Sequence, residues 1–153
     1  MNITPQQYIR IAQIVSESSY CKKHRVGAIL VKNDNIIALG YNGTPRGFMN
    51  KCEDSTGQTL PEVLHAETNC MTKVGREAED SVMYTTMAPC LECAKMIIQC
   101  QIRHVYYLSD YRNEDGLDLL RRANIFFYKI EPFKWTYRMS LTQSDNGLKN
   151  VYF

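Results

Sequence analysis

Two short motifs constrain this chain more than any other feature of its sequence. The first is H-A-E at residues 65–67, and the second, about one secondary-structure element further on, is P-C-L-E-C at residues 89–93. One imidazole and two thiolates provide three protein ligands for Zn²⁺, and a tetrahedral ion held by three side chains keeps its fourth position for water. We therefore expect one catalytic zinc per chain, held by His65, Cys90 and Cys93. Glu67 is then a proton carrier rather than a ligand.

The C-x-x-C pattern by itself does not identify a catalytic zinc site. It also occurs in redox pairs and in structural zinc sites closed by a fourth protein ligand, which Cys70 or Cys100 could supply here. A structural zinc site has no need of a carboxylate beside its histidine, and a redox pair has no need of His65. The two motifs together, in this order, favour a catalytic zinc.

Composition limits the class of protein and of partner. The 153 residues are 44% hydrophobic, which suits one domain with one core. The net charge is only +2, so the chain lacks the strong positive field that binding a long phosphate backbone requires, and a small charged substrate fits better. No stretch of about 18 apolar residues occurs, and residues 1–5 lack the features of a secretory signal. We therefore expect a cytoplasmic protein without membrane contact, with its six cysteines reduced.

The first third of the chain predicts a helix followed by a β-hairpin. Thr4, Pro5 and Gln7 form a capping-box start for a helix that runs to about Ser19. Short apolar runs at 26–31 and 36–39 flank a turn rich in Asn and Asp, as in a hairpin.

The two motifs predict helices that begin at the metal ligands. Residues two apart in the middle of a helix point about 200° from each other, so His65 and Glu67 reach one site only if the helix starts at or just before His65. We expect this helix to end near Gly75, and Pro89 to open a second that reaches about Gln101. The remaining elements are strands at 81–87, 104–108 and 125–130 and a helix at 115–124. This order predicts an α/β fold in three layers, a five-stranded mixed sheet flanked by helices.

Three segments keep two interpretations each. The basic linker 21–25 is either a solvated loop or an anion-binding loop. The glycine-rich loop 40–47 is either a plain connection or a close backbone approach to a ligand. The tail 131–153 carries five aromatic residues and packs either on the domain or on a partner subunit.

From about Tyr8 to Ile130 the chain resembles the cytidine deaminase superfamily, and within it the deoxycytidylate deaminases. H-x-E followed by P-C-x-x-C is the signature of zinc-dependent nucleobase deaminases. The further segments that carry the resemblance are Val26-Gly27-Ala28, Gly40-Tyr41-Asn42-Gly43 with Pro45 and Gly47, Met83-Tyr84, Cys93-Ala94-Lys95, Ile97-Ile98-Gln99 and Ser109-Asp110-Tyr111.

The resemblance implies a cytidine-deaminase-like fold and hydrolysis of deoxycytidylate (dCMP) to deoxyuridylate (dUMP) and ammonia, which supplies dUMP for thymidylate synthesis. It implies Glu67 as the catalytic residue, and a hexamer activated by dCTP and inhibited by dTTP, with Mg²⁺ accompanying the triphosphates. The implied substrate contacts are Asn42 to the sugar and backbone near Ala66, Met87 and Ala88 to the base edge. Our own candidates for the phosphate and base contacts are Lys23, Tyr111 and Arg112. The implied effector contacts are Tyr41, Gly43, Arg46 and Gly47.

Some members of the superfamily carry a second zinc, and this chain matches only part of that ligand set. Cys21 and Cys52 correspond to two of its ligands, but residues 53–64 contain neither cysteine nor histidine. The sequence therefore argues against a second, structural zinc. Two other functions stay open: a deaminase of tRNA adenosine or another nucleobase, and a zinc-stabilised regulatory or interaction domain without turnover.

Overall fold

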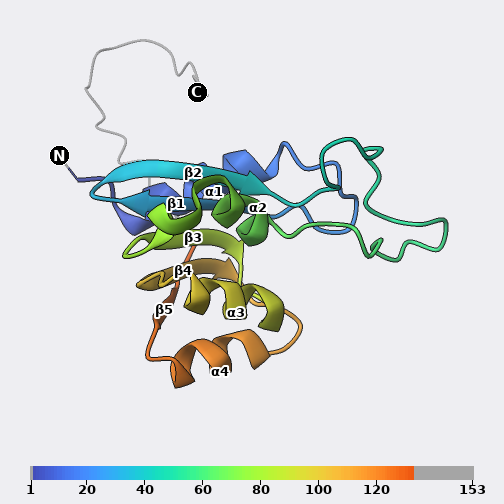
Figure 1. Ribbon diagram of the computed structural model, residues 1–153. Helices are drawn as coiled ribbons and strands as arrows, with labels where there is room; N and C mark the ends of the chain where they lie inside the picture. Colours follow the sequence, from blue (N-terminus) through green and yellow to red (C-terminus); the bar gives the residue numbers. More distant parts are fainter. Residues whose placement is uncertain (1, 133–153) are drawn as a thin grey trace, which may run out of the picture.

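The computed structural model describes residues 2–132 and forms a five-stranded mixed sheet between two layers of helices (Figure 1). The strands lie in the order β2-β1-β3-β4-β5. β1 pairs antiparallel with β2 and β3, whereas β4 pairs parallel with β3 and β5. The strands are β1 (Gly27–Lys32), β2 (Asn35–Tyr41), β3 (Val82–Met87), β4 (His104–Ser109) and β5 (Phe126–Lys129). The predicted α/β class and mixed sheet are confirmed.

The helices fall on the two faces of the sheet unequally. Of the helices within residues 2–132, α1 packs on one face, where Tyr8 and Ile9 meet Ile29 and Tyr84. The other helices pack on the opposite face around a core that includes Met71, Met83, Ile97, Val105 and Leu120. The helices are α1 (Pro5–Ser16), α2 (Ala66–Val74), the 3-10 turn η1 (Gly75–Ala78), α3 (Leu91–Gln99) and α4 (Asp115–Arg122). None of the helices within residues 2–132 is both long and apolar enough to cross a membrane.

Local signals in the sequence account for the helix starts better than for the ends. The capping box forms as predicted: Gln7 N donates to Thr4 Oγ1 at 3.3 Å, and Thr4 N donates to Gln7 Oε1 at 2.8 Å. Helix α1 ends at Ser16, three residues before the predicted end, and the Ser19 hydroxyl instead donates to the Asn42 carbonyl at 2.8 Å. The aromatic tail interpretation concerns residues that lie almost wholly outside the described part of the chain.

Candidate active site

The side chains of His65 and Cys90 converge because each residue is the N-cap of a helix. His65 caps α2 and Cys90 caps α3, and both have extended backbone conformations. The His65 side chain makes no bond to α2 and is directed instead at the sulfurs of Cys90 and Cys93. The predicted start of α2, at or just before His65, is slightly early, because α2 begins at Ala66 with His65 as its N-cap. Helix α3 begins at Leu91, so Pro89 stands before the cap rather than inside the helix as predicted.

The three predicted ligands lie at the separations that a tetrahedral metal requires. His65 Nδ1 is 3.4 Å from Cys90 Sγ and 3.4 Å from Cys93 Sγ. Bond lengths of about 2.3 Å to sulfur and 2.0–2.1 Å to nitrogen give roughly 3.5 Å between two ligands of a tetrahedral zinc. One nitrogen and two sulfurs all lie within 4.8 Å of one another. The donor set therefore fits Zn²⁺ with three protein ligands.

The ionisation of the two sulfurs is linked. A hydrogen bond with Cys93 lowers the pKa of Cys90, and a hydrogen bond with Cys90 together with burial raises the pKa of Cys93. A hydrogen bond with Cys90 also raises the pKa of His65. Because zinc binds thiolates, metal binding would displace the proton that remains on the pair.

Glu67 lies in the first turn of α2, buried beside the three ligands. It is 4% exposed, and Cys93 Sγ donates to its Oε2 at 3.7 Å. Burial raises the pKa of its carboxyl to about 7. A carboxyl group in this place is close enough to the metal position to move protons there without being one of the three ligands.

Two glycines allow other elements to pack tightly against this site. A Cβ on Gly40 in β2 would lie 2.4 Å from the carbonyl oxygen of Ala66, and one on Gly116 in α4 would lie 2.1 Å from that of Pro89. Any side chain at these positions would displace backbone next to His65 or Cys90. Gly40 therefore serves the close packing of β2 on α2.

A pocket of about 530 Å³ opens at the end of the sheet where β3 and β4 finish, above the three ligands. The carboxyl ends of parallel strands commonly carry such sites. The lining includes all seven predicted substrate contacts together with His65, Glu67 and Cys90, and Cys93 is buried beside them. The seven are Lys23, Asn42, Ala66, Met87, Ala88, Tyr111 and Arg112.

Several of these groups are already partly hydrogen-bonded. Asn42 Oδ1 accepts from Val26 N at 2.8 Å, and its Nδ2 donates to the His24 carbonyl at 2.8 Å. The side chain keeps one donor hydrogen and one acceptor lone pair for a ligand. Ala88 N donates to the Ser109 carbonyl at 2.8 Å, so Ala88 has only its carbonyl to offer a base edge.

The predicted effector contacts are not part of this pocket. Among them, Gly43 is buried, and its backbone N–H and carbonyl both bond to Leu64, at 3.1 Å and 2.8 Å. Tyr41, Arg46 and Gly47 are exposed on the surface of the same loop. Their role stays a prediction.

The comparisons with known proteins agree with this geometry. Residues 3–109 match the family described as the cytidine and deoxycytidylate deaminase zinc-binding region. This chain belongs to that family. The deoxycytidylate deaminase of Saccharomyces cerevisiae is 34% identical over 141 residues, which are 82% of this chain and 45% of the yeast protein. The human deoxycytidylate deaminase is 32% identical over 142 residues, 84% of this chain and 80% of the human protein.

A solved structure extends the similarity to the whole fold. The dCMP deaminase of cyanophage S-TIM5, crystallised in complex with dCMP and dUMP, superposes with a TM-score of 0.80 at 40% identity. The match covers 84% of this chain and 100% of the phage chain. The chain spans 45% of the length of the yeast relative.

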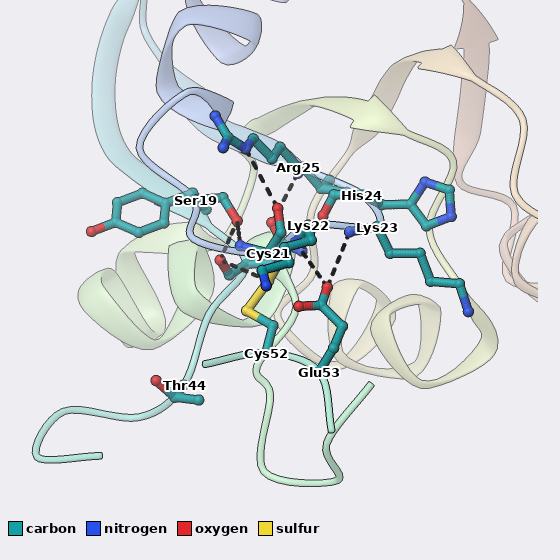
Figure 2. The surroundings of a disulfide bond; sticks show 12 residues. Ser19, Cys21, Lys22, Lys23, His24, Arg25, Thr44, Cys52 and Glu53 are labelled. Atoms are coloured by element: carbon teal, nitrogen blue, oxygen red, sulfur yellow. Dashed lines mark hydrogen bonds between the residues drawn. A yellow bond between two sulfur atoms is a disulfide. The ribbon is translucent and has the colours of Figure 1, made fainter. Parts of the chain in front are cut away.

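One expectation about the cysteines is wrong. Cys21 and Cys52 form a disulfide, with their Cα atoms 5.0 Å apart, whereas all six thiols were expected to be reduced (Figure 2). That expectation came from the lack of a secretory signal, which carries no information on which cysteines the fold brings together. Sulfurs bonded to each other are not thiolates, so the pair as it stands offers no ligands to a second zinc.

Sequence reasoning also missed Glu53, which lines the pocket. It is 9% exposed, although the polar composition of its segment predicts an exposed loop. Nothing in that segment signals the burial, because the sequence does not show that Cys52 next to it pairs with Cys21. Figure 2 shows the Glu53 carboxylate directed at the linker that begins with Cys21.

Proposed function

We propose that this chain is a zinc-dependent hydrolase that converts dCMP and water to dUMP and ammonia. The observation that carries the proposal is the triangle of His65, Cys90 and Cys93, with Glu67 buried beside it at the base of an open pocket. The choice of dCMP is supported by the similarity to the yeast, human and cyanophage enzymes.

Glu67 carries the protons of the reaction. His65, Cys90 and Cys93 would hold Zn²⁺, which would lower the pKa of a water molecule to roughly 7 and so supply a nucleophile at neutral pH. Glu67 accepts the proton that this water loses and passes it to N3 of the cytosine ring as C4 is attacked. It then delivers the second proton of the water to the departing amine, which leaves as ammonia while the C4 carbonyl forms.

The pocket orients the nucleotide with its base innermost. Backbone at Ala66, Met87 and Ala88 holds the base edge, and Asn42 bonds to the sugar hydroxyl with its remaining donor and acceptor. Phosphate is held by basic side chains in the lining, Lys23 and Arg112, while Tyr111 contacts the base. The Arg112 guanidinium lies 5.4 Å from the centre of the Tyr111 ring, a cation–π contact between the two side chains.

The test is ultraviolet absorbance during incubation with dCMP, deoxycytidine, cytidine and cytosine. We expect dCMP to be turned over far more efficiently than either nucleoside, with kcat as well as KM affected. Binding energy from a remote phosphate can be used to position the ring, so its removal lowers kcat too. Equal kcat/KM for dCMP and deoxycytidine would contradict the assignment of Lys23 and Arg112 to phosphate.

Two further arms of the same assay separate the alternatives. Deamination of adenosine in an anticodon stem-loop, without turnover of dCMP, would indicate a tRNA deaminase. Stoichiometric zinc with no turnover of any compound would indicate a regulatory or interaction domain.

We also propose control and assembly of the kind that the resemblance implies: a hexamer activated by dCTP and inhibited by dTTP, with Mg²⁺ on the triphosphates. The proposed effector contacts are Tyr41, Gly43, Arg46 and Gly47. In this role the enzyme supplies dUMP for thymidylate synthesis in the cytoplasm. Support comes from the sequence resemblance to deoxycytidylate deaminases.

A further inference from the structure

The basic linker 21–25 is held to the loop that carries Glu53 by two backbone hydrogen bonds. Lys22 N and Lys23 N both donate to Glu53 Oε1, at 2.9 Å and 3.1 Å (Figure 2). A buried carboxylate is costly unless it is hydrogen-bonded, and bonds from N–H groups to a charged acceptor are among the stronger ones in proteins. The carboxylate of Glu53 is therefore an anchor for the linker.

The loop behind Glu53 is built so that this anchor stays in place. Glu53 and Thr59 form an isolated antiparallel bridge, and Leu60 N donates to the Cys52 carbonyl at 2.8 Å. Asp54 Oδ1 accepts from Thr56 N at 2.8 Å and from Gln58 N at 3.0 Å, which closes the turn between them. These hydrogen bonds hold the loop together, with the Glu53 side chain directed at the linker.

Two further contacts fix the linker on either side of Lys22 and Lys23. The disulfide from Cys21 to Cys52 ties its beginning to the residue next to Glu53. Asn42 Nδ2 holds the His24 carbonyl at 2.8 Å near its end. Lys23 and His24 both line the pocket. The backbone of each is held by a hydrogen bond, to Glu53 and to Asn42 respectively.

The charge of Glu53 decides what its role at the pocket can be. A carboxylate repels a phosphate, so direct contact with that end of a nucleotide would be unfavourable. Its bonds to the Lys22 and Lys23 amides have the opposite effect, because they place a cationic side chain in the lining. The anchor orders the linker before the ligand binds. Less conformational entropy is then lost on binding, so the affinity is higher.

We propose that Glu53 is a positioning residue for the phosphate group of a nucleoside monophosphate: through the Lys22 and Lys23 amides it sets the linker so that Lys23 reaches the phosphate. This inference rests on the proposed function. It attributes to Glu53 part of the proposed specificity for dCMP over deoxycytidine. Glu53 itself touches neither the base nor the reacting atoms.

The experiment compares Glu53→Ala and Glu53→Gln in steady-state kinetics with dCMP and with deoxycytidine. For Glu53→Ala we expect kcat/KM for dCMP to fall about tenfold, the loss of one well-placed interaction, through a higher KM and a lower kcat. The kcat/KM for deoxycytidine should change far less, because no phosphate is present to be positioned. Glu53→Gln keeps an oxygen acceptor and should restore most of the affinity for dCMP.

Glu79→Ala is the matched control. It removes an exposed carboxylate beyond the opposite end of β3, and kinetics with both substrates should be unchanged. Equal losses for dCMP and deoxycytidine in Glu53→Ala would overturn the inference, because Glu53 would then act on the nucleoside or on the fold as a whole. A lower KM for dCMP in Glu53→Ala would also overturn it, because repulsion of the phosphate would then outweigh any positioning.

Amide hydrogen exchange at Lys22 and Lys23 separates this inference from the proposed function. Exchange should be faster in Glu53→Ala than in the wild type or Glu53→Gln, whether or not the protein turns over dCMP. Unchanged exchange at Lys22 and Lys23 would show that Glu53 does not anchor the linker and would overturn the inference. If the wild type deaminated neither compound, the proposed function would fail, and calorimetric titration with dCMP and deoxycytidine would then decide the inference through the same variants.

Discussion

Glu67 is the residue whose role can be separated most cleanly from metal binding. Glu67→Gln keeps the shape of the side chain but cannot carry protons through the reaction. Since general acid–base catalysis contributes about 10²- to 10⁴-fold, we expect kcat for dCMP to fall by at least about 10²-fold while zinc content stays the same. Metal analysis and initial rates on one preparation measure both. Loss of zinc from Glu67→Gln would show that Glu67 is a ligand.

Cys90→Ala should lose zinc, unlike Glu67→Gln. It removes one of three ligands, so zinc content and thermal stability should fall together, because metal-binding free energy is also folding free energy. Cys100→Ala is the control, since this thiol is half-buried and lies outside the group of ligands. It should keep zinc and activity. A Cys90→Ala protein that retains zinc at wild-type affinity would contradict the ligand assignment.

Among the elements, the packing of α4 on the start of α3 depends on a single glycine. Gly116→Ala would normally favour a helix, because alanine has the higher helix propensity. Here the added Cβ would lie 2.1 Å from the Pro89 carbonyl oxygen and 2.8 Å from the Cys90 carbonyl carbon, so backbone must shift. We expect a loss of about 1–3 kcal/mol in unfolding free energy and weaker zinc binding, as measured by denaturant titration and competition with a chelator.

Gly43→Ala is the comparison for that prediction, because a Cβ there would have no heavy atom within 4 Å. Its unfolding free energy should stay within about 0.5 kcal/mol of the wild type. A Gly116→Ala protein as stable as Gly43→Ala would mean that α4 moves away without cost to the zinc site.

The Cys21–Cys52 disulfide links the linker after α1 to the loop before α2. The two cysteines are 31 residues apart, and closing a loop of that size stabilises a protein by on the order of 3 kcal/mol through the entropy of the unfolded chain. Replacing both cysteines by serine should lower the unfolding free energy by up to this amount. A reductant should have the same effect on the wild type and none on the double variant. Peptide mapping that finds both thiols free in the purified protein would contradict the bond itself.

At the scale of the whole molecule, the prediction concerns assembly and regulation. We expect a hexamer by light scattering, and initial rates with dCMP that rise with dCTP and fall with dTTP. An effector must bind two states unequally, and a coupling of about 1–3 kcal/mol shifts substrate affinity roughly 5- to 150-fold. A monomer with hyperbolic kinetics, unaffected by either triphosphate, would discard the regulatory proposal and leave the catalytic one intact.

The sequence was sufficient for the order of the elements and for the candidate metal ligands, for a local reason. Capping residues, hydrophobic periodicity and ligand spacing act over a few residues, so Thr4 and Gln7 locate α1, and the angle between side chains two apart places the start of α2 close to His65. Errors of one to three residues, such as the end of α1 at Ser16, occur where no strong stop signal is present.

The tertiary structure decided every feature that joins distant segments. Glu53 and the Lys22 amide lie 31 residues apart along the chain, and nothing in the polar segment around Glu53 indicates that its carboxylate is buried. Gly40 is required because β2 crosses the start of α2, and Cys21 meets Cys52 only when the linker folds over the pocket. A local pattern encodes local conformation, whereas burial and pairing depend on which segments the packed sheet brings side by side.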